Sequence, residues 1–346
     1  FYGGEPLLNF ECILRILSFA KEITEINQID YSSSIVTNGY LLSEDVISLL
    51  KNFNPKKGEI IIWDNNSKDK TRSILKNYEK FPFIKIIYND ENIGFALGNN
   101  EASKYANGKY ILLLNSDTIS DFKVYEELIE YMENNKNVGV IGPKCIDELG
   151  VTQESFGYEF SILKEIFGKI FMSLYLEKIP IVKSIKNKIL YKSKPTEVDW
   201  IGGACALIRK DLWDKIGGLD SNFFFSNGDM IDFCYQVRKL GYKCIYYPLV
   251  SIIHKGSRIV TRDLKTRILG LKNGYLGSLY FLQKHKKSIF YIYLTKIIYI
   301  LISLFKGVIA LFLIPFNKKF KDLSFSHLYA SFFLFRNFFN NDFKNI

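Results

Sequence analysis

Runs of consecutive apolar residues alternate with polar and amphipathic segments along the first two thirds of the chain. Residues 59–64, 110–114 and 138–142 read EIIIWD, YILLL and VGVIG, and such continuous runs are typical of strands buried on both faces of a sheet. A helix is predicted after the polar turn that follows the first run, and another from about residue 122 after the second run. The order strand, helix, strand, helix predicts an open α/β sheet with parallel strands.

The first fifty residues follow the same rhythm. Apolar side chains recur at helical spacing within residues 8–25, and a β-branched run, SSSIVTNGY, follows at residues 32–40. A second helix is predicted from Ser43 to Asn52. The stretches GGE at the start of the chain and TNG after the β-branched run are expected at strand ends, on one rim of the sheet.

Near the other end of the chain, residues 288–316 are almost continuously apolar and numerous enough to cross a bilayer. Lysines flank this run on both sides, which argues against a single crossing under the positive-inside rule and favours an in-plane or re-entrant helix. A soluble amphipathic helix packed on a core is the alternative. At helical spacing, four polar side chains of the run fall on one arc: Thr295, Lys296, Ser303 and Lys306.

Composition narrows the class of protein only a little. The formal net charge of +10 over 346 residues suits an anionic membrane surface, phosphorylated substrates or nucleic acid. The five cysteines are loosely spaced and form no C-x-x-C pair, so we expect reduced thiols in a cytoplasmic protein, with neither a disulfide framework nor a zinc site. No signal peptide is visible, and because the first residue is Phe1 we expect further sequence upstream.

Two carboxylates follow predicted strands. Asp64 ends the run EIIIWD, and Asp117 comes three residues after YILLL. Ligands of open α/β sheets bind outside the carboxyl ends of the strands, so both side chains are candidate ligand contacts. The alternative is that both simply belong to turns, where Asp and Asn are common.

The opening FYGGEPLLN, followed by TNG, resembles the radical S-adenosylmethionine enzymes, in which the first motif contacts the methionyl group of the cofactor. Those enzymes hold a [4Fe–4S] cluster on a C-x-x-x-C-x-x-C loop. That loop is not found in this sequence and Cys12 stands alone, so we expect no functional iron–sulfur cluster. Residues 1–55 are therefore interpreted as a radical-SAM-like βα fragment that supplies the first strand and helix of the following domain.

Six motifs from about residue 58 to 260 occur in order: WDNNSKDKT, NIGFALGNN, YILLLNSDT, VDWIGGACALIRKDLWDKIGGLDSNFF, DMIDFCYQVRKLGYKCIYYP and IIHKGSR. Together they resemble the family-2 inverting glycosyltransferases of the GT-A type, closest to the rhamnosyltransferase-like group. The resemblance implies an α/β fold with a Rossmann-like mixed sheet flanked by helices. It places this GT-A domain at residues 56–260 with a helical insert at 160–195, and leaves residues 261–346 as a helical, membrane-associated region.

The resemblance also implies roles for individual residues. Asp117 and His254 would hold Mg²⁺ or Mn²⁺, hard cations that neutralise a leaving diphosphate. Asp229 and Asp232 would be the catalytic aspartates at the start of a helix. The residues implied to bind the nucleotide sugar are Asp64, Asn66, Asn92, Gly94, Phe95, Asn100, Asp117, Trp200, Gly203 and Arg258.

One position departs from the family pattern. Where the family carries a second adjacent acid, usually the general base, this chain has Met230. A thioether cannot accept the proton of an attacking hydroxyl. We therefore expect weak transfer, with Asp229 as a substitute base.

The predicted function is the inverting transfer of a sugar from a nucleotide-diphosphate donor to a hydroxyl of a glycan. We expect a lipid-linked acceptor of cell-surface polysaccharide synthesis, handled at the cytoplasmic face of the cell membrane. The expected partners are the nucleotide-sugar donor, the glycan or lipid-linked acceptor and the membrane surface, and no nucleic acid. The alternatives are a non-catalytic glycosyltransferase-like protein and a fragment of a radical S-adenosylmethionine enzyme.

Overall fold

A computed structural model describes residues 31–37 (backbone), 58–68, 70–115, 118–120, 123–159, 161, 192–223, 228–255, 264–285, 288–315 and 320–343. The chain divides into two compact units. The first comprises Phe1–Glu159, Leu190–Ser221 and Asp229–Ser257, and the second comprises Phe160–Ile189, Asn222–Gly228 and Arg258–Ile346. The helices predicted within residues 8–25 and 43–52, and most of the insert predicted at 160–195, lie outside the described residues.

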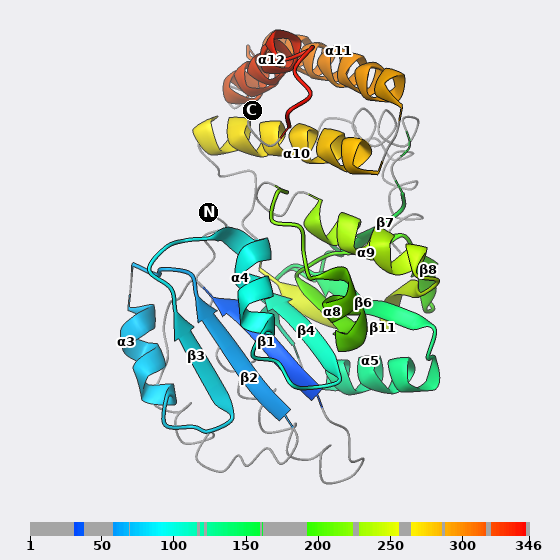
Figure 1. The fold of residues 1–346 in the computed structure, drawn as a ribbon. Coiled ribbons are helices and arrows are strands. Elements are labelled where there is room, and N and C mark those ends of the chain that lie inside the picture. Colours follow the sequence, from blue (N-terminus) through cyan, green and yellow to red (C-terminus); the bar gives the residue numbers. More distant parts are fainter. Residues whose placement is uncertain are drawn as a thin grey trace. The chain divides into compact units, whose positions relative to one another are not determined.

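The first unit contains a mixed sheet, which has nine strands in the part of the chain that the structure describes (Figure 1). Eight strands follow the order β3-β2-β1-β4-β10-β6-β11-β5, and β8 pairs with β11. The strands are β1 (Tyr31–Thr37), β2 (Gly58–Asp64), β3 (Ile84–Tyr88), β4 (Tyr110–Asn115), β5 (Thr118–Ile119), β6 (Val138–Ile146), β8 (Thr196–Val198), β10 (Cys205–Arg209) and β11 (Lys243–His254). A small second sheet pairs β7 (Phe156–Gly157) with β9 (Trp200–Ile201).

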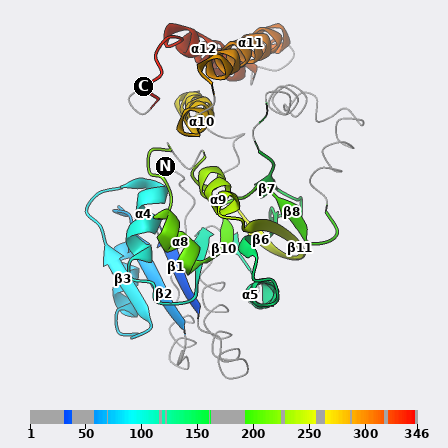
Figure 2. The ribbon, with the colours of Figure 1, turned by 45° about the vertical axis from the view of Figure 1, so that its right-hand side comes forward.

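The helices of this unit cover both faces of the main sheet (Figures 1 and 2). They are α3 (Thr71–Leu75) with the 3₁₀ turn η2 (Lys76–Tyr78), α4 (Gly94–Ser103), α5 (Lys123–Asn134), α8 (Lys210–Ile216) and α9 (Asp229–Lys239). The strands predicted from the three apolar runs are present as β2, β4 and β6, and the predicted helices that follow are α3 and α5. The α/β prediction for the fold is therefore confirmed.

Strands β3, β2, β1 and β4 run parallel to one another, with β1 between β2 and β4. The β-branched run near the start of the chain thus belongs to the same sheet as the apolar runs that follow it. Strand β10 is antiparallel to both β4 and β6, which makes the sheet mixed.

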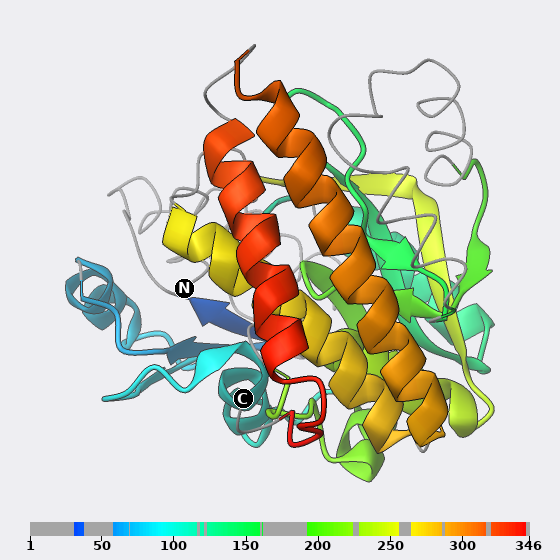
Figure 3. The same ribbon diagram turned by 90° about the horizontal axis from the view of Figure 1, so that it is seen from above.

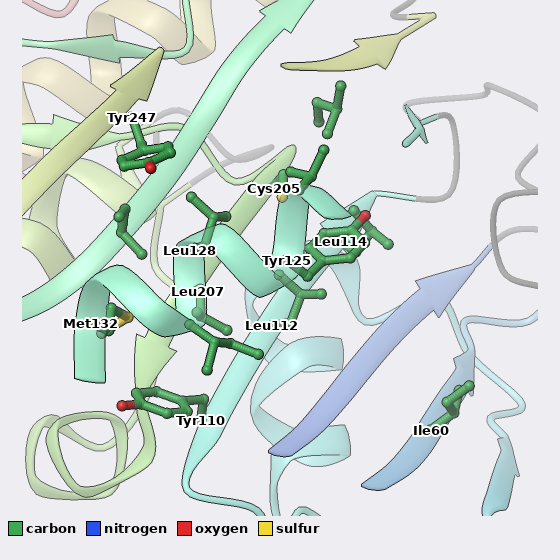
Figure 4. Close-up of a cluster of buried hydrophobic side chains, with 14 of the residues drawn as sticks. Ile60, Tyr110, Leu112, Leu114, Tyr125, Leu128, Met132, Cys205, Leu207 and Tyr247 are labelled. Carbon is green, nitrogen blue, oxygen red and sulfur yellow. The ribbon is translucent and has the colours of Figure 1, made fainter. Parts of the chain in front are cut away.

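Alternate side chains of each central strand enter different cores. Ile60, Leu112 and Leu207 lie in the core under α3 and α5, part of which Figure 4 shows in close-up. Ile61 and Leu113 lie in the opposite core under α4, α8 and α9. Because successive side chains of a strand point to opposite faces, a strand buried on both faces needs an unbroken apolar run.

The second unit is described as three helices, α10 (Leu264–Lys284), α11 (Ile289–Leu313) and α12 (Phe320–Arg336), with α11 and α12 packed side by side (Figure 3). Helix α11 begins at Ser288, whose Oγ accepts a hydrogen bond from Tyr291 N–H. Among the described helices, α11 is the one long and apolar enough to cross a membrane. Three members of the polar arc, Thr295, Lys296 and Ser303, are buried, and the fourth, Lys306, is half-buried. The sequence predicted the arc but did not assign it to the interior.

Lys296 joins α11 to the end of the chain. Its Nζ donates to the carbonyl oxygens of Phe338 at 2.6 Å and Asn340 at 2.7 Å, and to Asn341 Oδ1 at 2.9 Å. A buried ammonium group is stable only with such partners. Burial lowers its pKa to about 8. Lys296 therefore holds the segment after α12 against α11.

Large apolar side chains are exposed along the other faces of α11 and α12. Those more than half exposed are Ile289, Phe290, Leu301, Phe305, Leu311, Phe312, Phe325, Phe332 and Phe335, and the exposed Phe339 follows α12. Isolated exposed apolar residues are ordinary, but a set at helical spacing on two packed helices forms a continuous surface. We call this set the apolar face of the helical unit.

Candidate active site

The parallel strands bring their carboxyl ends to one level. In the register of the sheet, Asp64 at the end of β2 pairs with Thr37 of β1 and with Tyr88 of β3. Val36 pairs with Asn115 at the end of β4. The carboxyl ends of these strands therefore form a rim, and Asp64 lies on it. The stretch GGE and residues 38–39 of TNG, predicted for the same rim, lie outside the described residues.

Asp64 is completely buried and held by its neighbours. Its Oδ2 accepts a 2.6 Å bond from Arg72 Nε, and its Oδ1 accepts from Ser67 N–H at 3.2 Å. Arg72 also donates to the carbonyl oxygen of Asn89. The ion pair with Arg72 was not predicted; its signal in the sequence is an Arg at the start of the helix that follows a strand-end Asp. Asp64 is thus a fixed anchor of the rim.

Asn65 fastens the loop before α4 to the rim. Its Nδ2 donates to Asn92 Oδ1 at 2.9 Å and to the Gly94 carbonyl at 3.2 Å, and its Oδ1 accepts from Ile93 N–H at 2.9 Å. Asn66, the next residue, has a φ of +64°, a left-handed conformation that Asn tolerates well. Sequence reasoning chose Asn66 and Asn92 but missed Asn65, which positions the loop.

The start of α4 is open to solvent. Asn92 and Gly94 are exposed, and Gly94 has a φ of +82°, a conformation that favours glycine. Asn92 Oδ1 accepts from Gly94 N–H at 3.0 Å. The N-terminus of a helix suits the negative charge of a phosphate.

Phe95, Gly203 and Met230 come together from three distant parts of the sequence. A Cβ placed on Gly203 would lie 3.1 Å from Phe95 Cζ and 3.3 Å from Met230 Cγ. Any side chain at Gly203 would therefore push against both residues. The start of α4, the backbone before β10 and the start of α9 form one wall of the site.

Asp229 opens α9 and is only 1% exposed. Its Oδ1 accepts a 2.7 Å bond from Met230 N–H, and its Oδ2 has no hydrogen-bond partner among the described residues. Burial raises the pKa of this carboxyl to about 7, opposed by the bond from Met230 N–H and reinforced by the negative charges of Asp232 and Asp220. A carboxylate with one uncommitted oxygen and a near-neutral pKa has the properties of a general base.

Asp232, one helical turn further on, is also buried. Its Oδ2 accepts a 2.9 Å bond from Gln236 Nε2 on the same helix. Because this oxygen is already engaged within α9, Asp232 is better suited to shaping the charge around Asp229 than to accepting a proton.

His254 lies beside the predicted metal-binding turn. In the register of β11 with β5, His254 pairs with Thr118, the residue after Asp117. Its Nδ1 and Gln153 Oε1 are 2.9 Å apart, and Gln153 Nε2 donates to the His254 carbonyl at 2.8 Å. The sheet therefore brings together two positions that are 136 residues apart in sequence.

Two further predicted contacts have structural partners. Asn100 Nδ2 donates to the Leu219 carbonyl at 2.7 Å, and Asn100 Oδ1 accepts from Leu219 N–H at 2.8 Å. This pair of bonds fixes α4 to the loop after α8, so Asn100 has a positioning role in the site. The Trp200 indole lies on Gly157, where an added Cβ would approach its ring atoms to 2.3 Å.

The predicted ligand contacts Asp117 and Arg258 lie outside the described residues. Within the described part of the chain, no group of three His, Cys, Asp or Glu side chains could hold a metal ion. The donor set expected for the cation is a carboxylate, an imidazole and the oxygens of a diphosphate. His254, brought level with Thr118, fits that set.

Comparisons with known proteins agree on one family. A sequence profile described as "Glycosyl transferase family 2" matches residues 42–217. An uncharacterised glycosyltransferase of Methanocaldococcus jannaschii is 33% identical over 144 residues, which are 40% of this chain and 48% of the relative.

Two longer alignments reach named transferases. A low-salt glycan biosynthesis hexosyltransferase of Haloferax volcanii is 26% identical over 64% of this chain and 66% of its own length. An N-acetylglucosaminyl-diphospho-decaprenol L-rhamnosyltransferase of Mycobacterium tuberculosis is 20% identical over 59% of this chain and 68% of its own length. The chain thus spans about half of the first relative and about two thirds of the other two.

Proposed function

The chain belongs to glycosyl transferase family 2, and on this premise we propose that it transfers a sugar from a nucleotide diphosphate to a glycan hydroxyl with inversion. Its mixed sheet flanked by helices is the GT-A-type fold predicted from the sequence. The observation that carries the proposed chemistry is the uncommitted Oδ2 of buried Asp229. Asp229 takes the hydroxyl proton as the acceptor oxygen bonds to the anomeric carbon and the bond to the diphosphate breaks.

The donor is proposed to lie along the rim of the sheet. Asp64 faces the nucleoside, the open start of α4 at Asn92 and Gly94 receives the phosphates, and Gly203, packed against Phe95 and Met230, borders the sugar. Asp117 and His254 would hold Mg²⁺ or Mn²⁺, which neutralises the leaving diphosphate when bound. We also propose that Arg258 and Trp200 contact the donor.

The donor site can be tested by binding. Asp117→Ala is expected to abolish the metal-dependent binding of a nucleoside diphosphate, measured by calorimetry with and without Mn²⁺. Asp214→Ala, which removes an exposed carboxylate of α8, is the matched control and is expected to bind normally. Unchanged metal-dependent affinity in Asp117→Ala would contradict the assignment.

The acceptor is proposed to be lipid-linked and to be handled at the cytoplasmic face of the membrane. The support is the apolar face of the helical unit together with the lysines at both ends of α11. Lys296, the most deeply buried charged side chain of α11, faces the interior of the helical unit. An in-plane helix with one exposed apolar face explains this division better than a helix surrounded by lipid. The rhamnosyltransferase relative carries a diphospho-decaprenol acceptor in its name.

The opening motif is proposed to be a radical-SAM-like fragment without radical chemistry. The sequence offers Cys12 alone and no cysteine triad near it. Anaerobic reconstitution with iron and sulfide is expected to give no [4Fe–4S] absorption. A stoichiometric cluster that cleaves S-adenosylmethionine would contradict the proposal that the opening motif performs no radical chemistry.

A non-catalytic glycosyltransferase-like protein is the second candidate function. The observation in its favour is Met230 at the position where the family pattern has an acid. Donor binding with no transfer to any acceptor, in both the unmodified chain and Met230→Asp, would favour this candidate.

A further inference from the structure

A short segment of the second unit leads directly into the helix that begins with Asp229. Residues 222–228 belong to that unit, whereas Asp229 and the rest of α9 belong to the first. At this point the two units are joined by the peptide bond between Gly228 and Asp229. Whatever fixes Gly228 within the second unit therefore acts on the start of α9 through one covalent bond.

Phe223 packs on Gly228. Its side chain is buried, and a Cβ added to Gly228 would lie 2.5 Å from Phe223 Cδ1 and 2.6 Å from Phe223 Cε1. The ring therefore rests on the Cα atom of Gly228, and a side chain at this position would collide with it. Gly228 also has a φ of +122°, a conformation that residues with a Cβ rarely adopt. The backbone before Asp229 is thus shaped by a glycine and by the ring packed on it.

Phe223 packs in turn on helix α10. The centre of its ring lies 4.9 Å from that of Tyr280, with an angle of 64° between the two planes, which is a favourable geometry for an aromatic pair. Lys284 lies one helical turn further along α10, and its Nζ is 5.9 Å from the centre of the Phe223 ring, within the range of a cation–π contact. Two side chains of one helix therefore hold Phe223.

Helix α10 is fixed within the helical unit on both sides of Tyr280. Before it, Tyr275 OH and Ser303 Oγ of α11 are 2.6 Å apart. After it, Gln283 Nε2 donates to the Asn341 carbonyl at 2.9 Å. Tyr280 itself is buried, so its ring is a firm support for Phe223.

We propose that Phe223 and Tyr280 are positioning residues for Asp229. Their ring contact holds Gly228, and the peptide bond after Gly228 holds the first residue of α9 in its buried place. The inference rests on the proposed function for the role of Asp229 as the base. It gives α10, which lies in the region assigned from the sequence to the membrane, a part in sugar transfer as well.

The first test measures the pKa of Asp229 and needs no enzymatic activity. The full chain is labelled with ¹³C at the aspartate carboxyl carbons, and the NMR signal of Asp229 is identified by its loss in Asp229→Asn. Burial is the main cause of the raised pKa, so loosening the start of α9 admits water. In Phe223→Ala and in Tyr280→Ala the pKa should fall from about 7 by about one unit or more, toward its ordinary value. The charged groups that act on Asp229, Asp220 and Asp232, are unchanged in these variants.

Phe281→Ala is the matched control. It removes a buried aromatic side chain from the next position of the same helix, where the ring packs 4.6 Å from that of His285. Melting curves should show comparable losses of stability in Phe281→Ala and Tyr280→Ala, because both leave a cavity in the helical unit. The pKa of Asp229 should stay at its unmodified value in Phe281→Ala.

Conservative variants separate the ring contact from a general loss of packing. Tyr280→Phe keeps the ring and should restore the unmodified pKa of Asp229. Phe223→Leu serves in place of Phe223→Ala if the latter does not fold, and it should lower the pKa in the same direction. An unchanged pKa in the variants that remove a ring, or an equal fall in Phe281→Ala, would overturn the proposal.

Transfer assays show what the position of Asp229 contributes to the reaction. In Phe223→Ala and in Tyr280→Ala, kcat should fall about tenfold or more, because a small displacement of a catalytic group can cost about 10²-fold. KM for the nucleotide sugar should change little, since the donor is proposed to bind at other residues. The double variant should lose no more than the worse single variant, because both side chains act through Gly228. Additive losses would contradict this shared action.

The two measurements separate this inference from the proposed function. If the pKa of Asp229 falls in the variants but the unmodified chain transfers sugar to no acceptor, the contact positions Asp229 and the proposed function is contradicted. If the unmodified chain transfers sugar and Phe223→Ala and Tyr280→Ala transfer it equally fast at every pH, the positioning role is overturned and the proposed function stands.

Discussion

Asp229→Asn is expected to lower sugar transfer by roughly 10²-fold or more while making the fold more stable. The loss follows because general base catalysis typically contributes about 10²- to 10⁴-fold, and an amide cannot take the proton of the acceptor hydroxyl. The gain follows because the buried carboxylate is costly: its Oδ2 has no described partner, and its pKa is raised to about 7. An enzyme from which a catalytic group is removed should show this opposite movement of activity and stability.

The pKa of Asp229 fixes the direction in which stability and the rate of sugar transfer change with pH. The pKa of Asp229 is about 7 in the folded chain and about 4 in an unfolded one, so the folded chain binds the proton more tightly. The unmodified chain therefore loses stability as the pH rises from about 4 to about 7, and the loss is then complete. Three pKa units correspond to roughly 4 kcal/mol, which Asp229→Asn should recover at pH 8 and not at pH 3. Transfer by the unmodified chain should rise as the pH passes about 7.

Asp211→Asn is the matched control. Asp211 lies in the first turn of α8, and its Oδ1 accepts a hydrogen bond from the next N–H at 2.9 Å, as that of Asp229 does, but Asp211 is exposed. This variant is expected to keep both activity and stability. Melting curves at several pH values and a transfer assay with a nucleotide sugar measure the two properties. Transfer at the unmodified rate by Asp229→Asn would remove Asp229 from the reaction.

Met230→Asp tests the same site from the other direction. It restores the adjacent acid of the family pattern, so transfer should rise within the range of about 10²- to 10⁴-fold that a base supplies. It also puts a carboxylate into an apolar cluster beside Phe95 and Gly203, so the melting temperature should fall. Met230→Leu keeps the cluster apolar and should leave the rate unchanged. If Met230→Asp is silent and the unmodified chain is fast, the base lies elsewhere.

Charging the apolar face is expected to release the protein from membranes. Leu301 and Phe312 of α11 lie on one helical face and are 58% and 73% exposed. Burying two such side chains in lipid contributes roughly 3–6 kcal/mol, so Leu301→Asp/Phe312→Asp should reduce binding to anionic vesicles about a hundredfold or more. Because neither side chain is buried in the helical unit, the fold should be retained.

The control for this result lies in the first unit. Leu149 and Leu249 are 75% and 58% exposed, so Leu149→Asp/Leu249→Asp adds the same charge to comparably exposed leucines. It should still sediment with vesicles of phosphatidylcholine and phosphatidylserine. Sedimentation of both double variants to the same extent, or failure of the unmodified chain to sediment at all, would assign α11 and α12 to a soluble helical unit.

The sequence alone determined the elements whose side-chain pattern reports their own burial. Strands β2, β4 and β6 were predictable because a central strand covered on both faces must be apolar at every position. The polar arc of α11 was predictable because Thr295, Lys296 and Ser303 recur at helical spacing, but only the structure shows that this arc is buried. Asp64 was placed at the rim because the carboxyl ends of parallel strands meet there.

Only the tertiary structure decided which of these elements meet. Strand β10 enters the sheet antiparallel between β4 and β6, and this order brings Gly203 against Phe95 and Met230. The pairing of His254 with Thr118 likewise joins residues far apart in the chain. Hydrophobic periodicity reports which face of an element is buried but not its partner, because any apolar face of matching shape satisfies the same pattern; the order of the strands and the helix crossings select the partner.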